Sequence, residues 1–261
     1  MSSQEAFLAR VRRALHKEPS SAASRPPLLW HDHDTAAVAA RRMSNVRQRA
    51  ELVARLQQEL VAVGGSVACV ASVVEAQRYI TRLAQAKGVE LVVRWQSILL
   101  EALEIDAALQ QQGITIHTAA LPTNAMGDEV THAATLAARR QALRNLLARA
   151  DLGLSGVDYI IAETGTLVLT ALPGQMRGVS LLPPVHVAVA RTEQVLATLA
   201  DALLMVHTSG ADLQQHLTSC LSFVTGPSRT GDIELQLTVG VHGPGELHLV
   251  LLDESQTLPC V

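Results

Sequence analysis

The chain has 261 residues, 48% of them hydrophobic, and a formal net charge of −3, which suits one large α/β domain or two small ones. Aromatic residues make up only 2%, which leaves little material for stacking on nucleobases, so we expect no nucleic-acid binding. The three cysteines stand far apart without a C-x-x-C pair, so the sequence indicates no disulfide framework and no metal site, and it lacks the four thiolates that a four-iron cluster needs.

The start of the chain, "MSSQEAFLARVRRALHKEPS", is amphipathic and has no apolar core followed by a cleavage site, so it does not read as a secretory signal. No run of residues approaches the roughly 20 apolar positions that a membrane-spanning helix needs. We therefore expect a cytoplasmic protein without a membrane span.

A helical arm is predicted ahead of the α/β part. Residues 3–17 carry apolar side chains at helical spacing, and "EPSSAASRPP" then breaks the pattern. A long helix is predicted over 35–63, ending at Gly64-Gly65, where glycine tolerates the positive φ of a helix end. We assign 1–60 to this arm and long helix, and 61–261 to the α/β domain. The arm is basic, which suits docking on an acidic partner.

Short apolar runs then alternate with helical patterns. Strands are predicted at 66–72, 89–95 and 114–120, and helices at 73–88 and 99–113. Alternation at this interval predicts a mostly parallel sheet flanked by helices on both faces. Further along, the patterns predict helices at 127–156 and 192–205, strands at 157–163, 166–172, 185–190 and 221–225, and a short antiparallel part made by 233–243 and 245–253.

Three polar clusters interrupt these apolar elements at strand ends. The first is "AETGT", the second is "PGQMRGVSLLPPVH", and the third is "TGPSRTGDIE". Small residues, hydroxyls and one arginine after a parallel strand suit an anion, because free backbone N–H groups and a guanidinium converge on it. The candidate ligand-binding residues are Glu163, Thr164, Gly165, Thr166, Arg177, Ser180, Gly226, Ser228, Arg229, Thr230, Asp232, Glu234 and, in the later "GVHGPGE", His242.

Glu163 raises a specific question, because a carboxylate among apolar residues is costly unless it is paired or hydrogen-bonded. Residues 151–261 hold eleven acidic residues against three arginines, so Arg177 and Arg229 are natural partners for Glu163. In the alternative interpretation, Glu163 caps backbone N–H groups in a turn and the arginines only tie loops together. Ligands of open α/β sheets bind at the carboxyl ends of strands, so the third cluster is the first place to look.

Familiar motifs are absent from the sequence. It contains no G-x-G-x-x-G, no P-loop, no H-E-x-x-H and no G-x-S-x-G pattern. The sequence therefore gives no support for a dinucleotide-binding protein, a P-loop nucleotide-binding protein, a zinc protease or a serine hydrolase. The residues therefore indicate a binding site but name no catalytic residue.

The segments "ADLGLSGVDYIIAETGTLVL", "GVSLLPPVHVAV" and "TGPSRTGDIELQLTVGVHGPGELHLVLLD" resemble the LUD domain of the lactate-utilisation protein C family. The resemblance is strongest over 151–253 and weaker back to about residue 60; Gly231 departs from it, where alanine is expected. It implies a fold similar to ribose-5-phosphate isomerase, glucosamine-6-phosphate deaminase and the CoA-transferases. It also implies a part in bacterial oxidation of L-lactate to pyruvate beside two iron–sulfur partner proteins.

This resemblance supplies no established catalytic residue, so the site residues rest on local chemistry alone. Lactate oxidation releases two electrons, and the chain has neither cluster ligands nor a dinucleotide motif, so we expect the iron–sulfur clusters on partners and no cofactor in this chain. We interpret the chain as a subunit that binds a small anion or a partner. The alternatives are a stand-alone enzyme on a phosphorylated or CoA-linked metabolite and a non-catalytic assembly module, and a homo-oligomer stays open.

Overall fold

The computed structural model describes residues 43–120, 129–209, 220–231 and 237–253. The predicted helix over 3–17 and the first part of the predicted long helix lie outside these residues. The division into an arm over 1–60 and a domain over 61–261 therefore stays a prediction.

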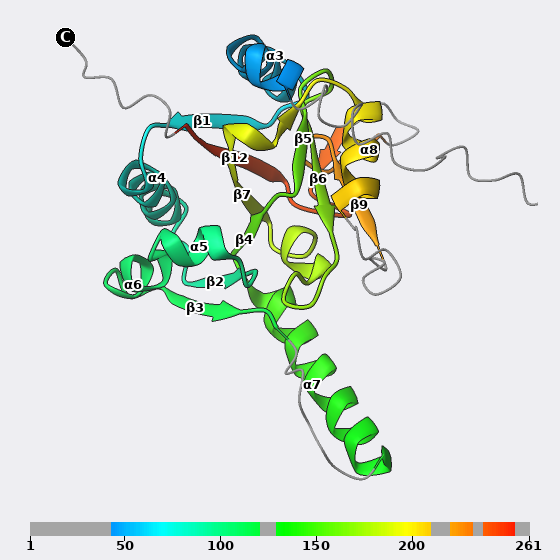
Figure 1. Cartoon of the computed structure of the whole chain (residues 1–261). Helices are drawn as coiled ribbons and strands as arrows, with labels where there is room; N and C mark the ends of the chain where they lie inside the picture. Colours follow the sequence, from blue (N-terminus) through cyan, green and yellow to red (C-terminus); the bar gives the residue numbers. More distant parts are fainter. Residues whose placement is uncertain (1–42, 121–128, 210–219, 232–236, 254–261) are drawn as a thin grey trace, which may run out of the picture. The chain divides into compact units, whose positions relative to one another are not determined.

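Six parallel strands form the main sheet. They are β1 Ser66–Val70, β2 Leu91–Arg94, β3 Thr115–Thr118, β4 Leu152–Gly156, β7 Val185–Arg191 and β12 Glu246–Leu252. Their order across the sheet is β1-β12-β7-β4-β2-β3, and every neighbouring pair is parallel (Figure 1). The central strands β4, β7 and β12 are almost wholly buried, as expected for parallel strands covered on both faces. The predicted parallel sheet is confirmed.

Helices precede and connect these strands. They are α3 Arg49–Ala62, α4 Val73–Ala86, α5 Ile98–Ala102, α6 Ile105–Gln110, α7 Glu129–Arg149 and α8 Leu199–Ser209, with short 3-10 helices η1 Arg177–Ser180 and η2 Thr192–Gln194. The predicted helix at 99–113 is divided into α5 and α6, because Glu104 between them has a left-handed φ of 48°.

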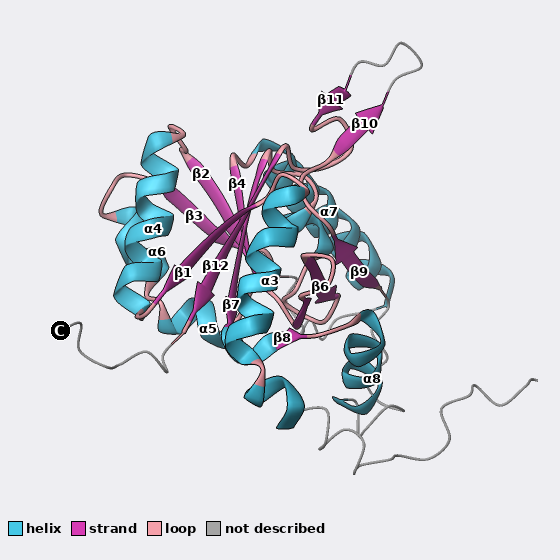
Figure 2. Cartoon of the chain, turned by 90° about the horizontal axis from the view of Figure 1, so that it is seen from above, coloured by secondary structure: helices cyan, strands magenta, loops and turns pink. Residues whose placement is uncertain are grey.

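The helices α3 and α4 lie on opposite faces of the main sheet (Figure 2). Ser66 of β1 is paired with His248 of β12, so their side chains share a face, and His248 contacts Tyr79 of α4. Cys69 stands three residues after Ser66 and therefore points to the other face. There its sulfur accepts a hydrogen bond from Gln57 of α3.

A second sheet carries the stretch from 158 to 170. Its strands are β8 Val195–Leu196, β5 Tyr159–Ile161, β6 Thr166–Thr170 and β9 Leu221–Val224, in that order. The β5–β6 and β6–β9 pairs are antiparallel, and β5–β8 is parallel. A separate antiparallel ribbon joins β10 Arg229–Gly231 to β11 Leu237–Val239 (Figure 2). We expected the third polar cluster to follow a parallel strand. It follows β9 of this second sheet instead, which is antiparallel to its neighbour β6.

Three further expectations are wrong. The helix predicted over 192–205 begins only at Leu199, because Val195–Leu196 form strand β8 beside β5. Residues 152–156 were predicted as the end of a helix, but they form the buried strand β4, in which a Cβ on Gly153 would collide with the carbonyl oxygen of Val179. The bare glycine lets η1 pack directly on β4. Residues 245–253 were predicted to be antiparallel, but β12 lies in the main sheet, parallel to β1 and β7.

The end of α3 matches its prediction in detail. Leu52, Leu56 and Leu60 are buried along one face of the helix. Gly64 has a φ of 88°, and the N–H of Gly65 donates to the carbonyl oxygen of Leu60 at 2.8 Å, which is a Schellman ending. Within the described residues, no helix combines the length and the apolar character needed to cross a membrane.

Candidate functional site

A chain of hydroxyl groups joins the first and third polar clusters. The Oγ1 atoms of Thr164 and Thr166 lie 2.7 Å apart, and those of Thr166 and Thr225 lie 2.8 Å apart. Thr164 lies in the turn between β5 and β6, Thr166 is the first residue of β6, and Thr225 directly follows β9. Thr164 and Thr225 are exposed and Thr166 is buried. Two clusters that are distant in sequence therefore meet, and two of their hydroxyls face solvent.

Glycines allow both of these loops to pack closely against the C-terminal end of α3. Gly165 has a φ of 63°, and a Cβ there would lie 2.6 Å from the backbone nitrogen of Leu60. Gly226 has a φ of 80°, and a Cβ there would lie 2.7 Å from the carbonyl oxygen of Val63. A side chain at either position would meet both backbone strain and a backbone clash. The two glycines in the motifs therefore bring the loops to the same end of α3.

Arg229 completes this group. Its guanidinium lies over Gly64, where a Cβ would collide with Nη2, and the side chain is exposed. A cation at the carboxyl end of a helix is favourable, because the free carbonyl groups carry partial negative charge. We name Thr164, Thr166, Thr225 and Arg229 the threonine–arginine surface.

Glu163 does not pair with an arginine. Its Oε1 accepts a hydrogen bond of 2.8 Å from the backbone nitrogen of Leu199, the first residue of α8. In the described part of the chain, no ion pair joins Glu163 to Arg177 or Arg229. The predicted pairing is wrong, and the capping alternative is what the structure shows. The physical reason is that the free N–H groups and positive dipole end of α8 already satisfy the carboxylate.

The second cluster has its own surroundings. Arg177 is exposed at the start of η1, and Ser180 at its end is buried and donates to the carbonyl oxygen of Arg177 at 3.1 Å. Gly178 between them lies against Leu147 of α7. The Ser180–Arg177 hydrogen bond therefore lies within η1, and no described hydrogen bond or ion pair joins either residue to the threonine–arginine surface.

His186, also in the second cluster, is fully buried in β7, with its Nε2 2.8 Å from the hydroxyl of Ser155. Burial disfavours the charged imidazolium and lowers the pKa of His186 to about 4. Among the described atoms its Nδ1 has no hydrogen-bond partner. This histidine is a neutral core residue at ordinary pH.

The remaining candidates lie near the ribbon. The backbone nitrogen of Ser228 donates to Pro244 at 2.8 Å, and its carbonyl accepts from Gly240 at 3.0 Å, so the loop that carries the exposed His242 packs on Ser228. Thr230 lies in β10, but its side chain is outside the described part. Asp232 and Glu234 lie outside the described residues altogether.

A half-buried carboxylate that the sequence reasoning passed over is Asp158, which directly precedes β5. Its Oδ2 accepts from the backbone nitrogen of Thr170 at 2.6 Å and from the hydroxyl of Thr170 at 2.9 Å. Burial raises the pKa of Asp158, and the hydrogen bonds from Thr170 oppose that rise. These bonds join the two ends of the β5–β6 hairpin, so Asp158 has a structural role.

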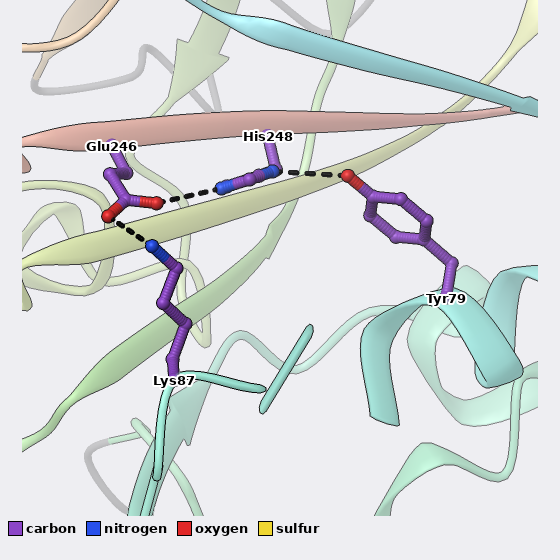
Figure 3. A network of polar contacts seen from close by, with 4 residues as sticks. All are labelled: Tyr79, Lys87, Glu246 and His248. Atoms are coloured by element: carbon purple, nitrogen blue, oxygen red, sulfur yellow. Dashed lines mark hydrogen bonds and ion pairs between the residues drawn. The ribbon is translucent and has the colours of Figure 1, made fainter. Parts of the chain in front are cut away.

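A polar network on the α4 face was also missed (Figure 3). The hydroxyl of Tyr79 lies 3.1 Å from Nδ1 of His248. The Nε2 of that ring lies 3.2 Å from one carboxylate oxygen of Glu246, and the other oxygen accepts from Lys87 at 2.5 Å. The Lys87 hydrogen bond is the main reason why the pKa of Glu246 is lowered, and burial raises the pKa of Tyr79.

The network borders an open cleft with a volume of about 560 Å³. We call it the α4 cleft; it is lined by Val70 at the end of β1 and by Glu75, Arg78, Tyr79, Arg82, Leu83 and Ala86 of α4. One sequence signal was available, since Glu246 and His248 are two apart in a strand and must share a face. Their partners on α4 follow only from the fold. Within the described residues, no group of three or more histidine, cysteine, aspartate or glutamate side chains is placed to hold a metal ion.

Parts of this chain are similar in sequence to known proteins. A "Lactate utilization protein C" from Halalkalibacterium halodurans is 40% identical over 96 residues, which are 37% of this chain and 41% of that protein. An "Uncharacterized electron transport protein YkgF" from Escherichia coli is 25% identical over 237 residues, covering 78% of this chain and 48% of that protein. The chain thus spans less than half the length of these two relatives.

A solved structure shares the fold. The crystal structure of a DUF162 family protein from Deinococcus radiodurans matches with a TM-score of 0.53 and 20% identity, covering 78% of this chain and 98% of that one. The family model described as "LUD domain" matches residues 53–252, which include the main sheet, the second sheet and both described polar sites. The chain belongs to the LUD domain family.

Proposed function

We propose that the chain is a subunit of a bacterial L-lactate utilisation system, and that it binds a small carboxylate at the threonine–arginine surface. Relatives from Halalkalibacterium halodurans and Macrococcus caseolyticus that are 40% and 36% identical over part of their lengths carry the name "Lactate utilization protein C". These names support the system to which the chain is assigned. The carboxylate site rests on geometry.

The observation that carries the site is the meeting of Thr164, Thr225 and Arg229 at one end of α3. Two exposed hydroxyls belong to the hydrogen-bonded threonine chain, and an exposed guanidinium lies over the neighbouring Gly64. A guanidinium supplies a charge-assisted bond to a carboxylate, and hydroxyl groups donate or accept as needed. The described ion pairs leave Arg229 without an acidic partner, so its charge is available to a ligand.

The redox chemistry is assigned to partner proteins. Oxidation of L-lactate to pyruvate releases two electrons, and the three cysteines of this chain cannot supply the four thiolates of a four-iron cluster. The chain also has no dinucleotide-binding motif. In this proposal two iron–sulfur proteins hold the clusters, and this cytoplasmic subunit presents or senses the carboxylate.

Growth tests the proposal. Deleting the gene in its own host should abolish or strongly slow growth on L-lactate and leave growth on pyruvate unchanged. The unaltered gene should restore growth on L-lactate, and an Arg229→Ala version should not. Arg139→Ala, which removes an exposed arginine of α7, is the matched control and should restore growth fully. Normal growth of the deletion strain on L-lactate would contradict the assignment to this system.

A second readout separates ligand binding from assembly. In a pull-down from the host, the Arg229→Ala protein should still retain the same iron–sulfur partners as the unaltered protein, since its defect lies in carboxylate binding. Loss of those partners would instead make the threonine–arginine surface a docking site for protein and would contradict the carboxylate proposal.

A further inference from the structure

The α4 cleft carries positive charge that the fold does not use. Arg78 and Arg82 stand four residues apart on α4, so their side chains lie on one face of the helix, and both are exposed. No hydrogen bond or ion pair joins either guanidinium to another described residue. These two arginines are the first element of a site for an oxyanion, because planar guanidinium groups bind phosphate and carboxylate with paired hydrogen bonds.

The acid in the cleft does not neutralise them. Glu75 lines the same cleft, but its Oε2 accepts a hydrogen bond of 2.9 Å from the backbone nitrogen of Ala71. Its own backbone nitrogen donates at 3.2 Å to the hydroxyl of Ser72, the N-cap residue of α4. Glu75 carries one negative charge against the two arginines, so the charged residues that line the cleft still sum to one positive charge.

The Tyr79–His248–Glu246–Lys87 network supplies the second element, a hydroxyl with a fixed orientation (Figure 3). Lys87 holds Glu246 as a carboxylate, which can only accept hydrogen bonds, so Nε2 of His248 donates to it. With the ring proton on Nε2, Nδ1 is an acceptor, and the hydroxyl of Tyr79 donates to it. The lone pairs of the Tyr79 oxygen are therefore left to accept from a hydroxyl of a ligand.

The third element is size. A volume of about 560 Å³ falls in the range of roughly 300–1,000 Å³ that is usual for small-molecule sites. Val70, Leu83 and Ala86 give the cleft an apolar lining beside the charged residues. These dimensions suit an organic molecule rather than a bare inorganic ion.

From these three elements we propose that the α4 cleft is a binding site for an organic oxyanion that carries a phosphate or carboxylate group and a free hydroxyl. Arg78 and Arg82 bind the oxyanion, and the Tyr79 oxygen accepts a hydrogen bond from the hydroxyl of the ligand. His248, Glu246 and Lys87 act as positioning residues that set the direction of the Tyr79 hydroxyl. This site lies on the opposite face of the main sheet from α3, so it is separate from the threonine–arginine surface and does not depend on the proposed function.

Isothermal titration of the full chain with four probes tests the site. 3-Phosphoglycerate carries a phosphate, a hydroxyl and a carboxylate; glycerate lacks the phosphate; phenyl phosphate lacks the hydroxyl; and inorganic phosphate lacks the carbon skeleton. We expect 3-phosphoglycerate to bind more tightly than inorganic phosphate. Comparable binding of glycerate would assign the charge to a carboxylate, and much weaker binding of glycerate would assign it to a phosphate.

Variants locate the binding. The double change Arg78→Ala and Arg82→Ala should weaken the best probe at least about 10-fold, since a charge-assisted hydrogen bond contributes roughly 1.5–3 kcal/mol. Tyr79→Phe should weaken 3-phosphoglycerate by several-fold and leave phenyl phosphate unchanged, because only the first probe donates a hydroxyl. Arg139→Ala on α7 is the control and should change neither affinity.

Some results would overturn the inference. One is the absence of binding heat with any of the four probes; another is equal affinity of the double arginine variant and the unaltered protein. A Tyr79→Phe effect of the same size on both organic phosphates would show that the ring packs the cleft and would remove the hydroxyl from the proposal. Both arginines are exposed, so circular dichroism of the double variant should match that of the unaltered chain. None of these results depends on growth on lactate.

Discussion

Thr166 and Thr225 are 59 residues apart in the chain, and their hydroxyl oxygens lie 2.8 Å from each other. This contact joins the start of β6 to the loop that follows β9. With the glycines beside α3, it turns two separate sequence motifs into one surface. A neutral hydrogen bond of this kind contributes about 1 kcal/mol to stability, so its main effect is to fix the positions of the two loops.

Replacing Thr166 by valine should destabilise the protein by about 1 kcal/mol and also loosen the two loops. The side chain is buried, so valine keeps the packing but leaves Thr164 and Thr225 without their shared partner. Urea denaturation measures the loss. An unchanged midpoint together with unchanged lactate binding would show that the hydroxyl chain has no role in shaping the surface.

Gly165→Ala should be among the most damaging small substitutions in the chain, at a cost of at least about 2 kcal/mol. The residue has a φ of 63°, and the new Cβ would lie 2.6 Å from the backbone of α3. Gly88→Ala is a matched control, because Gly88 has the same φ of 63° and nothing within 4 Å of its position for a Cβ. Thermal denaturation of both variants should show the larger loss at Gly165. Equal losses would mean that backbone strain alone, without the clash, sets the cost.

Glu163→Ala should lower the free energy of unfolding by roughly 0.5–2 kcal/mol, the usual range for losing a helix cap. It should leave carboxylate binding unchanged, because Glu163 is bonded to the first N–H of α8. Denaturation and lactate titration of the same variant measure the two effects. A variant with normal stability and lost binding would restore Glu163 to the ligand site and contradict the capping role.

Stability should fall with acid in a window set by His186. Its pKa in the folded protein is about 4 because of burial, while that of an unfolded histidine is about 6.5. Between these values the unfolded chain binds the proton and the folded chain does not, so stability is full above pH 6.5 and declines as the pH falls towards 4. The full loss is on the order of 3 kcal/mol.

The change His186→Gln removes this titration while keeping a neutral polar group near Ser155. Urea denaturation at pH 7 and at pH 5 should show a smaller loss for the variant than for the unaltered protein. If both proteins lose the same stability, the acid sensitivity comes from other groups and the buried neutral histidine is not its source.

The regular part of the fold was readable from local patterns. Repeated strands and helices predicted the parallel sheet, and leucines every four residues followed by Gly64 and Gly65 predicted the end of α3. Strand β4 could not be predicted from the sequence. It contains Gly153, which is needed because η1 packs against it, and only the tertiary fold brings η1 there. The helical pattern of α7 also runs directly into β4, so the prediction extended the helix over the strand.

The sequence predicted several residues of the candidate site but not the contacts between them. Local chemistry singled out Thr164, Thr166 and Arg229. The expected pairing of Glu163 with an arginine was based on charge balance along the chain, which does not show that the N-terminus of α8 lies beside Glu163. The Tyr79–His248 contact spans 169 residues. No local pattern on α4 or β12 predicts which residues face one another across the sheet surface.

The most direct measurement is isothermal titration of L-lactate into the full chain, its Arg229→Ala variant and the Arg139→Ala control. We expect saturable binding to the unaltered protein and the control, with at least about 10-fold weaker binding to Arg229→Ala, the loss expected for one charge-assisted hydrogen bond. Equal affinity for all three proteins, or no binding to the unaltered chain, would contradict a carboxylate site at the threonine–arginine surface.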